Sequence, residues 1–301
     1  MRCVKPIILK PQPGEIVGMK VPCGQCIACR LNKVRDWTLR IMHESRYHKD
    51  NCFLTLTYAP VYQKPSLNKS DLQKFLKRLR KRIGQFRYYA CGEYGENHNL
   101  AHFHICLFGV GINHEVFNGK KYDRKGKGYY QENNPCWSFG NVYIAELNYA
   151  TARYVASYVN KKVFKDTKLY QVNNITLEFV VMSRNPGIGF NFVEQYKGLL
   201  LRQKNVRFKG KAIAMPRYYE NKVFDTEELK ELRKAEKQEH VVDDSHSIDV
   251  VLSYALTGKT QYEKNITARI NLKAKRSLDF EKDYKDFKSH DVLGKSSRSS
   301  N

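Results

Sequence analysis

Residues 86–108 decide the fold, and they read Phe-Arg-Tyr-Tyr-Ala-Cys-Gly-Glu-Tyr-Gly-Glu-Asn-His-Asn-Leu-Ala-His-Phe-His-Ile-Cys-Leu-Phe. The two ends, Phe86 to Glu93 and His102 to Phe108, are rich in aromatic and apolar side chains, which favours strands. The connector, residues 94–101, is rich in turn-forming residues, so the stretch predicts an antiparallel hairpin. Such a hairpin brings Glu93 close to His102.

The second strand of this hairpin carries two histidines, two residues apart. Side chains at this spacing point to one face of a strand, so His102 and His104 should lie side by side, with Cys106 beyond them. With Glu93 they make a set of nitrogen and oxygen donors that suits Mn²⁺ or Mg²⁺. Glu96, in the connector, is a substitute for Glu93. The alternative is a pair of polar side chains on an open sheet face near an ordinary surface glutamate.

Two tyrosines follow on a predicted helix, residues 149–164. Tyr154 and Tyr158 are four residues apart, which places both phenols on one helix face, and Lys161 continues that face. A phenol has a pKa near 10, so it must lose its proton before it attacks phosphorus. An ammonium from Lys161 or Lys162, together with a divalent ion, would favour that loss. The alternative is two amphipathic tyrosines that only pack.

The flanking segments alternate between strand and helix patterns. Apolar residues at helical spacing, ended by Gly84, predict a helix that Ser70 begins as the cap. Its opposite face is basic, and we expect that face to be solvated or to contact backbone phosphates. A further helix is expected over residues 27–47, further strands over residues 51–58, 141–147 and 177–182, and a turn over residues 185–189. This mixture predicts an α+β fold with a central antiparallel sheet and packed helices.

The chain divides into three predicted parts. Residues 1–50 form a cysteine-rich segment followed by a helix, and residues 51–202 form the main domain. Residues 203–301 form a charged extension with a helical piece at 226–240 and a disordered end. The roles of this extension and the oligomeric state are not predicted by the sequence.

The charge balance indicates a polyanionic partner. The 301 residues include 53 Lys and Arg against 30 Asp and Glu, a net charge of +23. A field this positive attracts nucleic acid, with gain from counterion release. No run approaches the ~20 apolar residues that span a bilayer, and the first ten residues lack the apolar core of a signal peptide. We therefore expect a cytoplasmic protein without a membrane partner.

The N-terminal cysteines form a second candidate metal site. Cys23, Cys26 and Cys29 follow two successive Cys-x-x-Cys steps, and Cys3 lies upstream. Four thiolates would bind a structural Zn²⁺. The alternative is a run of small buried thiols, and a redox role is least expected because no thioredoxin-like context surrounds the motif.

These motifs, in this order, resemble the HUH endonucleases over residues 51–165. The strand Phe53-Leu-Thr-Leu-Thr57 resembles their first motif, His102-Phe-His104 with Glu93 their metal motif, and Tyr154 to Lys162 their two-tyrosine helix. The resemblance implies an HUH or RRM-like sheet. Over residues 1–200 the chain more closely resembles replication initiators of microviruses of the gokushovirus type. That likeness rests on Pro22-Cys-Gly-Gln-Cys-Ile-Ala-Cys-Arg30, Cys91-Gly-Glu-Tyr-Gly-Glu96 and Met182-Ser-Arg-Asn-Pro-Gly-Ile-Gly189.

The resemblance implies rolling-circle replication in a bacterial host cell. One tyrosine would nick single-stranded DNA at an origin, leaving a 5′-phosphotyrosine and a 3′-OH that a host polymerase extends. The second tyrosine would later cut the displaced strand and allow it to be closed into a circle. The sequence contains no Gly-x-x-x-x-Gly-Lys-Ser/Thr loop, so we expect a host helicase to act with it.

Two alternatives stay open at this point. A relaxase or transposase would use the same residues on another DNA target. A non-catalytic binder of single strands would instead stack bases on Tyr88 and Tyr89 of the sheet.

Overall fold

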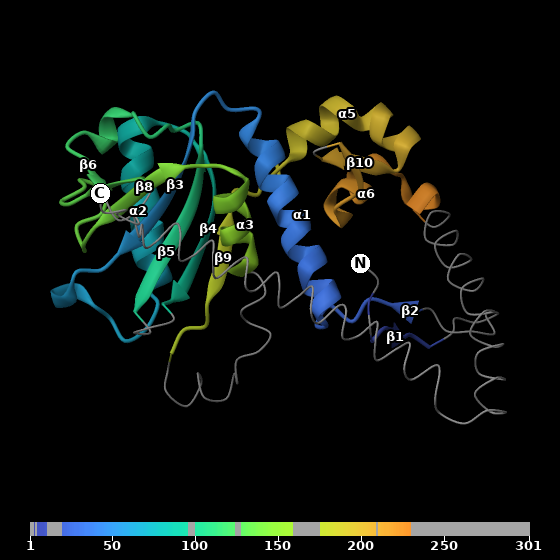
Figure 1. Cartoon of the computed structure of the whole chain (residues 1–301), viewed down its shortest axis with the longest axis horizontal. Helices are drawn as coiled ribbons and strands as arrows, with labels where there is room; N and C mark the ends of the chain where they lie inside the picture. The colour runs from blue at the N-terminus through green and yellow to red at the C-terminus, as the bar shows by residue number, and fades with distance from the viewer. Residues whose placement is uncertain are drawn as a thin grey trace, which may run out of the picture. The chain divides into compact units, whose positions relative to one another are not determined.

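The computed structural model describes residue 3 and residues 5–10, 20–95, 100–123, 128–158, 175–208 and 210–229. It divides into two compact units. The first runs from Arg30 to Val223, and the second combines the residues before Arg30 with those after Val223. The first unit contains the sheet (Figure 1). No helix among the described ranges is both long and apolar enough to cross a membrane.

The main sheet has seven strands in the order β6-β7-β8-β3-β5-β4-β9, and every neighbouring pair is antiparallel. The predicted α+β class is therefore confirmed. Its strands are β3 (Asn51–Thr57), β4 (Arg87–Tyr94), β5 (Ala101–Phe108), β6 (Lys121–Asp123), β7 (Gly128–Gln131), β8 (Val142–Glu146) and β9 (Phe179–Met182).

The remaining elements lie outside this sheet. The helices are α1 (Ile27–Ser45), α2 (Lys69–Ile83), α3 (Tyr149–Ser157), α5 (Phe190–Gln203) and α6 (Arg217–Val223), with short 3₁₀ turns at Pro60–Tyr62 and Glu115–Phe117. Two small antiparallel pairs complete the described chain, β1 (Ile7–Ile8) with β2 (Lys20–Val21) and β10 (Asn205–Phe208) with β11 (Lys211–Ala214).

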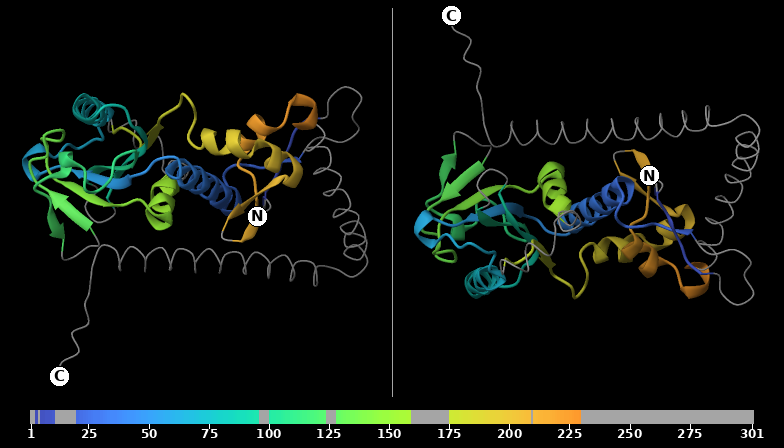
Figure 2. Two further views of the ribbon diagram at one scale, coloured as in Figure 1. Left: turned by 90° about the horizontal axis from the view of Figure 1, so that it is seen from above. Right: turned by 90° about the horizontal axis from the view of Figure 1, so that it is seen from below.

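Alternation along the central strands separates two hydrophobic cores. Side chains of β5 such as Phe103 and Ile105 face the core under α2, whereas Cys106 faces the core under α1 and α3. The two helices α2 and α3 accordingly cover opposite faces of the sheet, which Figure 2 shows from above and below. The histidines lie on the face that α3 covers.

Two predicted boundaries of α2 have different outcomes. Gly84 ends the helix with φ +81°, as predicted. The predicted Ser70 cap is wrong, because Asn68 is the N-cap and its side-chain oxygen accepts a hydrogen bond from the Ser70 backbone N–H at 3.0 Å. An asparagine oxygen before the first helical residue satisfies an amide that would otherwise have no partner. Most basic residues of α2 are exposed, on the sheet face away from the histidines.

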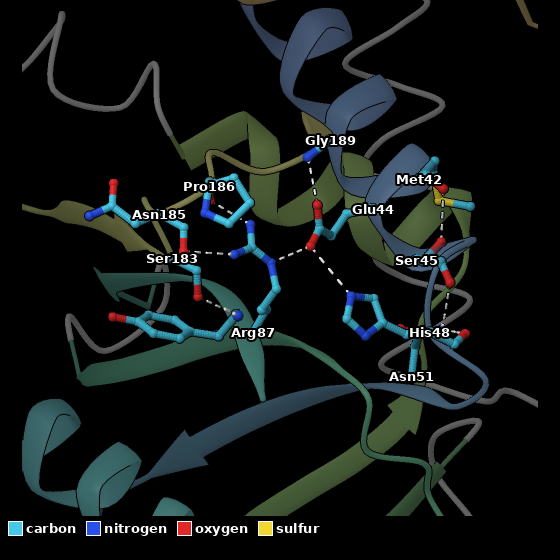
Figure 3. Close-up of polar contacts among 11 residues, drawn as sticks. Met42, Glu44, Ser45, His48, Asn51, Arg87, Ser183, Asn185, Pro186 and Gly189 are labelled. Atoms are coloured by element: carbon cyan, nitrogen blue, oxygen red, sulfur yellow. Dashed lines mark hydrogen bonds and ion pairs between the residues drawn. The ribbon is translucent and has the colours of Figure 1, made fainter. Parts of the chain in front are cut away.

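A buried carboxylate joins α1, β4 and the turn before α5 (Figure 3). Glu44 is 1% exposed; it pairs with the Arg87 guanidinium and accepts the Gly189 backbone N–H at 2.6 Å. Arg87 also donates to the Pro186 carbonyl at 2.7 Å. Gly189 has φ +80°, and a Cβ there would collide with the Tyr219 hydroxyl, so the turn requires glycine.

We expect Glu44→Ala to destabilise the first unit by about 3 kcal/mol, because the Arg87 charge and a buried amide lose their partner. Burial would raise the pKa of the Glu44 carboxyl, but hydrogen bonds from His48, Gly189 and Arg87 outweigh it and lower that pKa. A lowered folded-state pKa means that the stabilisation is present above the ordinary carboxyl range and is lost as pH falls through it.

Urea unfolding at several pH values measures both effects. The difference between the wild type and E44A should shrink toward acid pH, and Glu146→Ala, at an exposed position in β8, should change stability by less than about 0.5 kcal/mol. An E44A variant as stable as the wild type at neutral pH would contradict the role of this carboxylate.

Candidate metal and tyrosine site

The hairpin β4–β5 brings one carboxylate and two imidazoles together. Its register places Glu93 directly opposite His102. The Glu93 Oε1 atom lies 2.7 Å from His102 Nε2 and 2.9 Å from His104 Nε2. One ligand atom from each of the three residues lies within 4.8 Å of the others. The closeness expected from the turn-rich connector is therefore found.

The outer ring nitrogens fix the orientation of both imidazoles. His102 Nδ1 lies 3.0 Å from the Leu100 carbonyl oxygen, which can only accept, so this nitrogen carries the proton. His104 Nδ1 is held at 2.9 Å by the Thr55 hydroxyl. In a neutral His102 the lone pair on Nε2 then faces a carboxylate oxygen. Two acceptors this close require a proton or a cation between them.

The spacing of these atoms fits one octahedral cation. Two ligands about 2.1 Å from an ion and at right angles lie about 3.0 Å apart, and the pairs observed here are 2.7 Å and 2.9 Å apart. A carboxylate with two imidazoles leaves further coordination positions for oxygen atoms of a substrate. The donor set therefore fits a divalent ion such as Mn²⁺ or Mg²⁺.

The Glu93 carboxylate is held in its charged form. Its side chain is 2% exposed, and this burial alone would raise the pKa of the carboxyl. Hydrogen bonds with His102 and His104 outweigh that effect and hold the pKa of Glu93 well below its usual range. A negative charge is thus available at the point between the two imidazoles at neutral pH.

Helix α3 brings Tyr154 to the same point. An Asn148–Thr151 capping box begins the helix. The Tyr154 hydroxyl lies 3.3 Å from His104 Nε2 and 3.4 Å from Glu93 Oε1. Its ring stands edge-on to those of His104 and Phe53, with centroids 4.9 Å and 6.3 Å apart. The phenolic oxygen of Tyr154 therefore adjoins two of the three candidate ligands.

Tyr158 reaches the site by its ring. The ring stacks on His104 with centroids 5.4 Å apart, and it lies edge-on to Tyr154 at 5.0 Å. The expected pair of neighbouring phenols is found, but the two differ in exposure. Tyr154 is partly exposed, whereas Tyr158 is 1% exposed and its hydroxyl is buried.

The other predicted site residues have three outcomes. Lys161, Lys162 and Glu96 lie outside the described residues. Cys106 is fully buried in the core beneath α3 and belongs to neither group of candidate ligands found among the described residues. The four N-terminal cysteines, Cys3, Cys23, Cys26 and Cys29, form the other such group, which lies in the second unit.

The sequence interpretation missed the roles of two residues in β3. Thr55 lies directly opposite His104 in the sheet and binds its Nδ1. Phe53 stacks on the His104 ring with centroids 5.6 Å apart. Both belong to the half of β3 that alternates away from the buried Cys52, Leu54 and Leu56. That alternation is a signal in the sequence, but it becomes useful only when the pairing of β3 with β5 is known.

Burial of Tyr89 opposes the base-stacking alternative. Tyr89 is 0% exposed and packs in the core beneath α1 and α3, and Tyr88 is half-buried against the other core. A ring sealed within a core cannot offer a face to a nucleotide base.

The comparisons with known proteins agree on replication. A family model described as a "Replication-associated protein" of the ORF2 type matches residues 51–163, which contain both site motifs. No solved structure matches the chain.

Three phage proteins are similar over most of the chain. Replication-associated protein ORF2 of Spiroplasma virus 4 is 32% identical over 228 residues, covering 69% of this chain and 69% of that protein. Replication-associated protein VP4 of Bdellovibrio phage phiMH2K is 28% identical over 252 residues, covering 73% and 76%. Replication-associated protein ORF4 of Chlamydia phage 1 is 26% identical over 233 residues, covering 71% and 58%. The chain therefore belongs to the family of phage replication-associated proteins and is a replication initiator of the microvirus type.

Proposed function

We propose that this replication initiator is a metal-dependent endonuclease that nicks single-stranded DNA at an origin, with Tyr154 as the first nucleophile. One observation carries the proposal: the Tyr154 hydroxyl lies within 3.4 Å of both His104 Nε2 and Glu93 Oε1. A phosphate oxygen that shares a cation with these ligands would have its phosphorus within reach of the phenol. When bound, Mn²⁺ or Mg²⁺ would polarise that phosphate and lower the cost of charge in the transition state.

The nicking step is a transesterification. The Tyr154 oxygen forms a bond to phosphorus while the bond from phosphorus to the 3′ oxygen breaks. The phenolic proton balances the charge on the departing 3′ oxygen, so the products are a 5′-phosphotyrosine and a free 3′-OH. The number of phosphoester bonds is unchanged, and the later joining step therefore needs no nucleotide cofactor.

The exposure of the two phenols supports an order of attack. Tyr154 adjoins the candidate ligands by its oxygen, whereas the Tyr158 hydroxyl is buried and its ring stacks on His104. Tyr154 can attack from the conformation described here. Tyr158 must first turn its hydroxyl outward, so we assign it the second cleavage, on the regenerated junction. Lys161 or Lys162 would assist by stabilising a phenolate.

The partners proposed here follow from charge and chemistry. A net charge of +23 favours a DNA strand along the surface of the protein. The free 3′-OH requires a host polymerase, and opening the duplex requires a host helicase. The protein would therefore act in the cytoplasm of a bacterial cell.

A covalent-adduct assay tests the proposal. The wild-type protein is incubated with labelled single strands from a phage origin, with Mn²⁺ or with a chelator, and is then denatured in detergent. We expect labelled DNA to stay attached to the protein only with the divalent ion. Binding without any covalent adduct on strands that contain the origin would reject the nicking function.

A further inference from the structure

We propose that Cys3, Cys23, Cys26 and Cys29 bind one structural zinc ion in the second unit. All four sulfur atoms lie within 4.8 Å of one another, in a group distinct from the histidine site. The proposal does not depend on the nicking function, because none of these cysteines belongs to the candidate active site.

The distances between the sulfur atoms match a tetrahedral thiolate site. Four sulfurs about 2.3 Å from one zinc ion lie about 3.8 Å from each other. Cys3 Sγ lies 3.5 Å from Cys23 Sγ and 3.7 Å from Cys26 Sγ. A disulfide would require sulfurs about 2.05 Å apart, and all four cysteines are free thiols.

Backbone amides around the sulfurs already have the arrangement that a thiolate needs. The Cys23 N–H donates to Cys3 Sγ at 3.3 Å, and the Cys26 N–H donates to Cys23 Sγ at 3.3 Å. Donors of this kind orient metal-bound ligands and offset part of the negative charge of four thiolates. Ordinary buried thiols would have no need of two such amides.

The local fold explains how distant positions in the sequence meet. The register of β1 with β2 pairs Ile7 with Val21, so the same antiparallel course carries Cys3 alongside the chain just after Cys23 (Figure 1). Cys26 immediately precedes α1, and Cys29 lies in its first turn. A single ion would thus join the strand pair to the start of the helix.

This segment also lacks other means of support. Its strands are only two residues long, which is too short for an independently stable hairpin. The apolar residues of the first strand and the residue after it are exposed, Ile7 at 51%, Ile8 at 65% and Leu9 at 45%. Small segments without a core are commonly held by a metal ion, and zinc suits four thiolates best.

An iron–sulfur cluster is the chemical competitor. The Cys-x-x-Cys-x-x-Cys run is also found in ferredoxins. In a four-iron cluster, however, each cysteine binds a different iron, so the sulfurs are spread around the cluster instead of around one ion. The compact group observed here favours the single ion.

Metal analysis of the full-length protein, purified with a reductant and without added metal, tests the proposal. We expect about one zinc ion per chain, no acid-labile sulfide, and release of the zinc by a reagent that modifies thiols. Replacement of zinc by Co²⁺ should give the intense d–d bands of tetrahedral cobalt and a thiolate charge-transfer band.

Two variants separate this site from the rest of the protein. Cys26→Ser should reduce the zinc content at least about tenfold, whereas Cys136→Ala, at a buried thiol of the first unit, should leave it unchanged. Iron with sulfide, a chain without zinc, or full zinc retention in C26S would each overturn the proposal. The cobalt spectrum needs no variant, so misfolding of C26S would leave the test decisive.

Discussion

Replacing Tyr154 with phenylalanine is expected to lower nicking of origin single strands by at least about 10³-fold, because the variant lacks the nucleophilic oxygen. The change keeps the ring, and with it the edge-on contacts to His104 and Phe53. The fold and the binding of Mn²⁺ should therefore persist. Gel analysis of covalent adducts, together with calorimetric titration of Mn²⁺, measures both properties on the same preparation.

Two further phenylalanine variants serve as controls for Y154F. Tyr149→Phe removes a hydroxyl from the same helix, and its ring stacks on Phe208 away from the histidines; nicking should be unchanged. Tyr158→Phe should retain most of the first nick and lose the later cut that releases a circle. If Y158F abolished the first adduct while Y154F retained it, the proposed order of attack would be reversed.

Replacing Glu93 with glutamine is the second change with a large expected effect. The amide has the same shape but no charge, so the hairpin can fold while the cation loses its only anionic ligand among the three. We expect Mn²⁺ affinity to fall at least about 100-fold and nicking at least about 10³-fold. Thiolates do not select Mn²⁺, so the cysteine group should not mask the loss.

The two large effects differ in their signatures. Y154F should lose chemistry and keep metal binding, whereas E93Q should lose both. Glu146→Gln, at an exposed position in β8, is the matched control and should change neither. An E93Q variant that bound Mn²⁺ as the wild type does would show that the carboxylate is no ligand, and the proposed site would have to be redrawn.

Local patterns predicted the central part of this molecule well. The period of two in His102-Phe-His104 and the turn-rich connector fixed both the hairpin and the side of the sheet on which the histidines lie. The spacing of four residues placed Tyr154 beside Tyr158. These features depend on strand and helix geometry alone, which is why a single sequence carries them.

Features that depend on long-range pairing were out of reach. Thr55 reaches His104 only because β3 lies next to β5, and Glu44 meets Arg87 and Gly189 only after three distant elements have packed. The burial of Tyr158 likewise depends on how α3 lies against the sheet. No local period encodes these contacts, since their partners are far apart along the chain.

Identification of the residue that becomes linked to DNA tests the central claim most directly. Trypsin cuts after Arg153 and after Lys161, so both tyrosines fall in one peptide, Tyr-Val-Ala-Ser-Tyr-Val-Asn-Lys. After nuclease trimming of the adduct formed in the first nick, fragmentation of that peptide by mass spectrometry distinguishes its first residue from its fifth. We predict a phosphonucleotide on Tyr154. An adduct on any residue outside this peptide, or none at all with Mn²⁺ and an origin strand, would contradict the convergence of the imidazoles and the phenol on one phosphate.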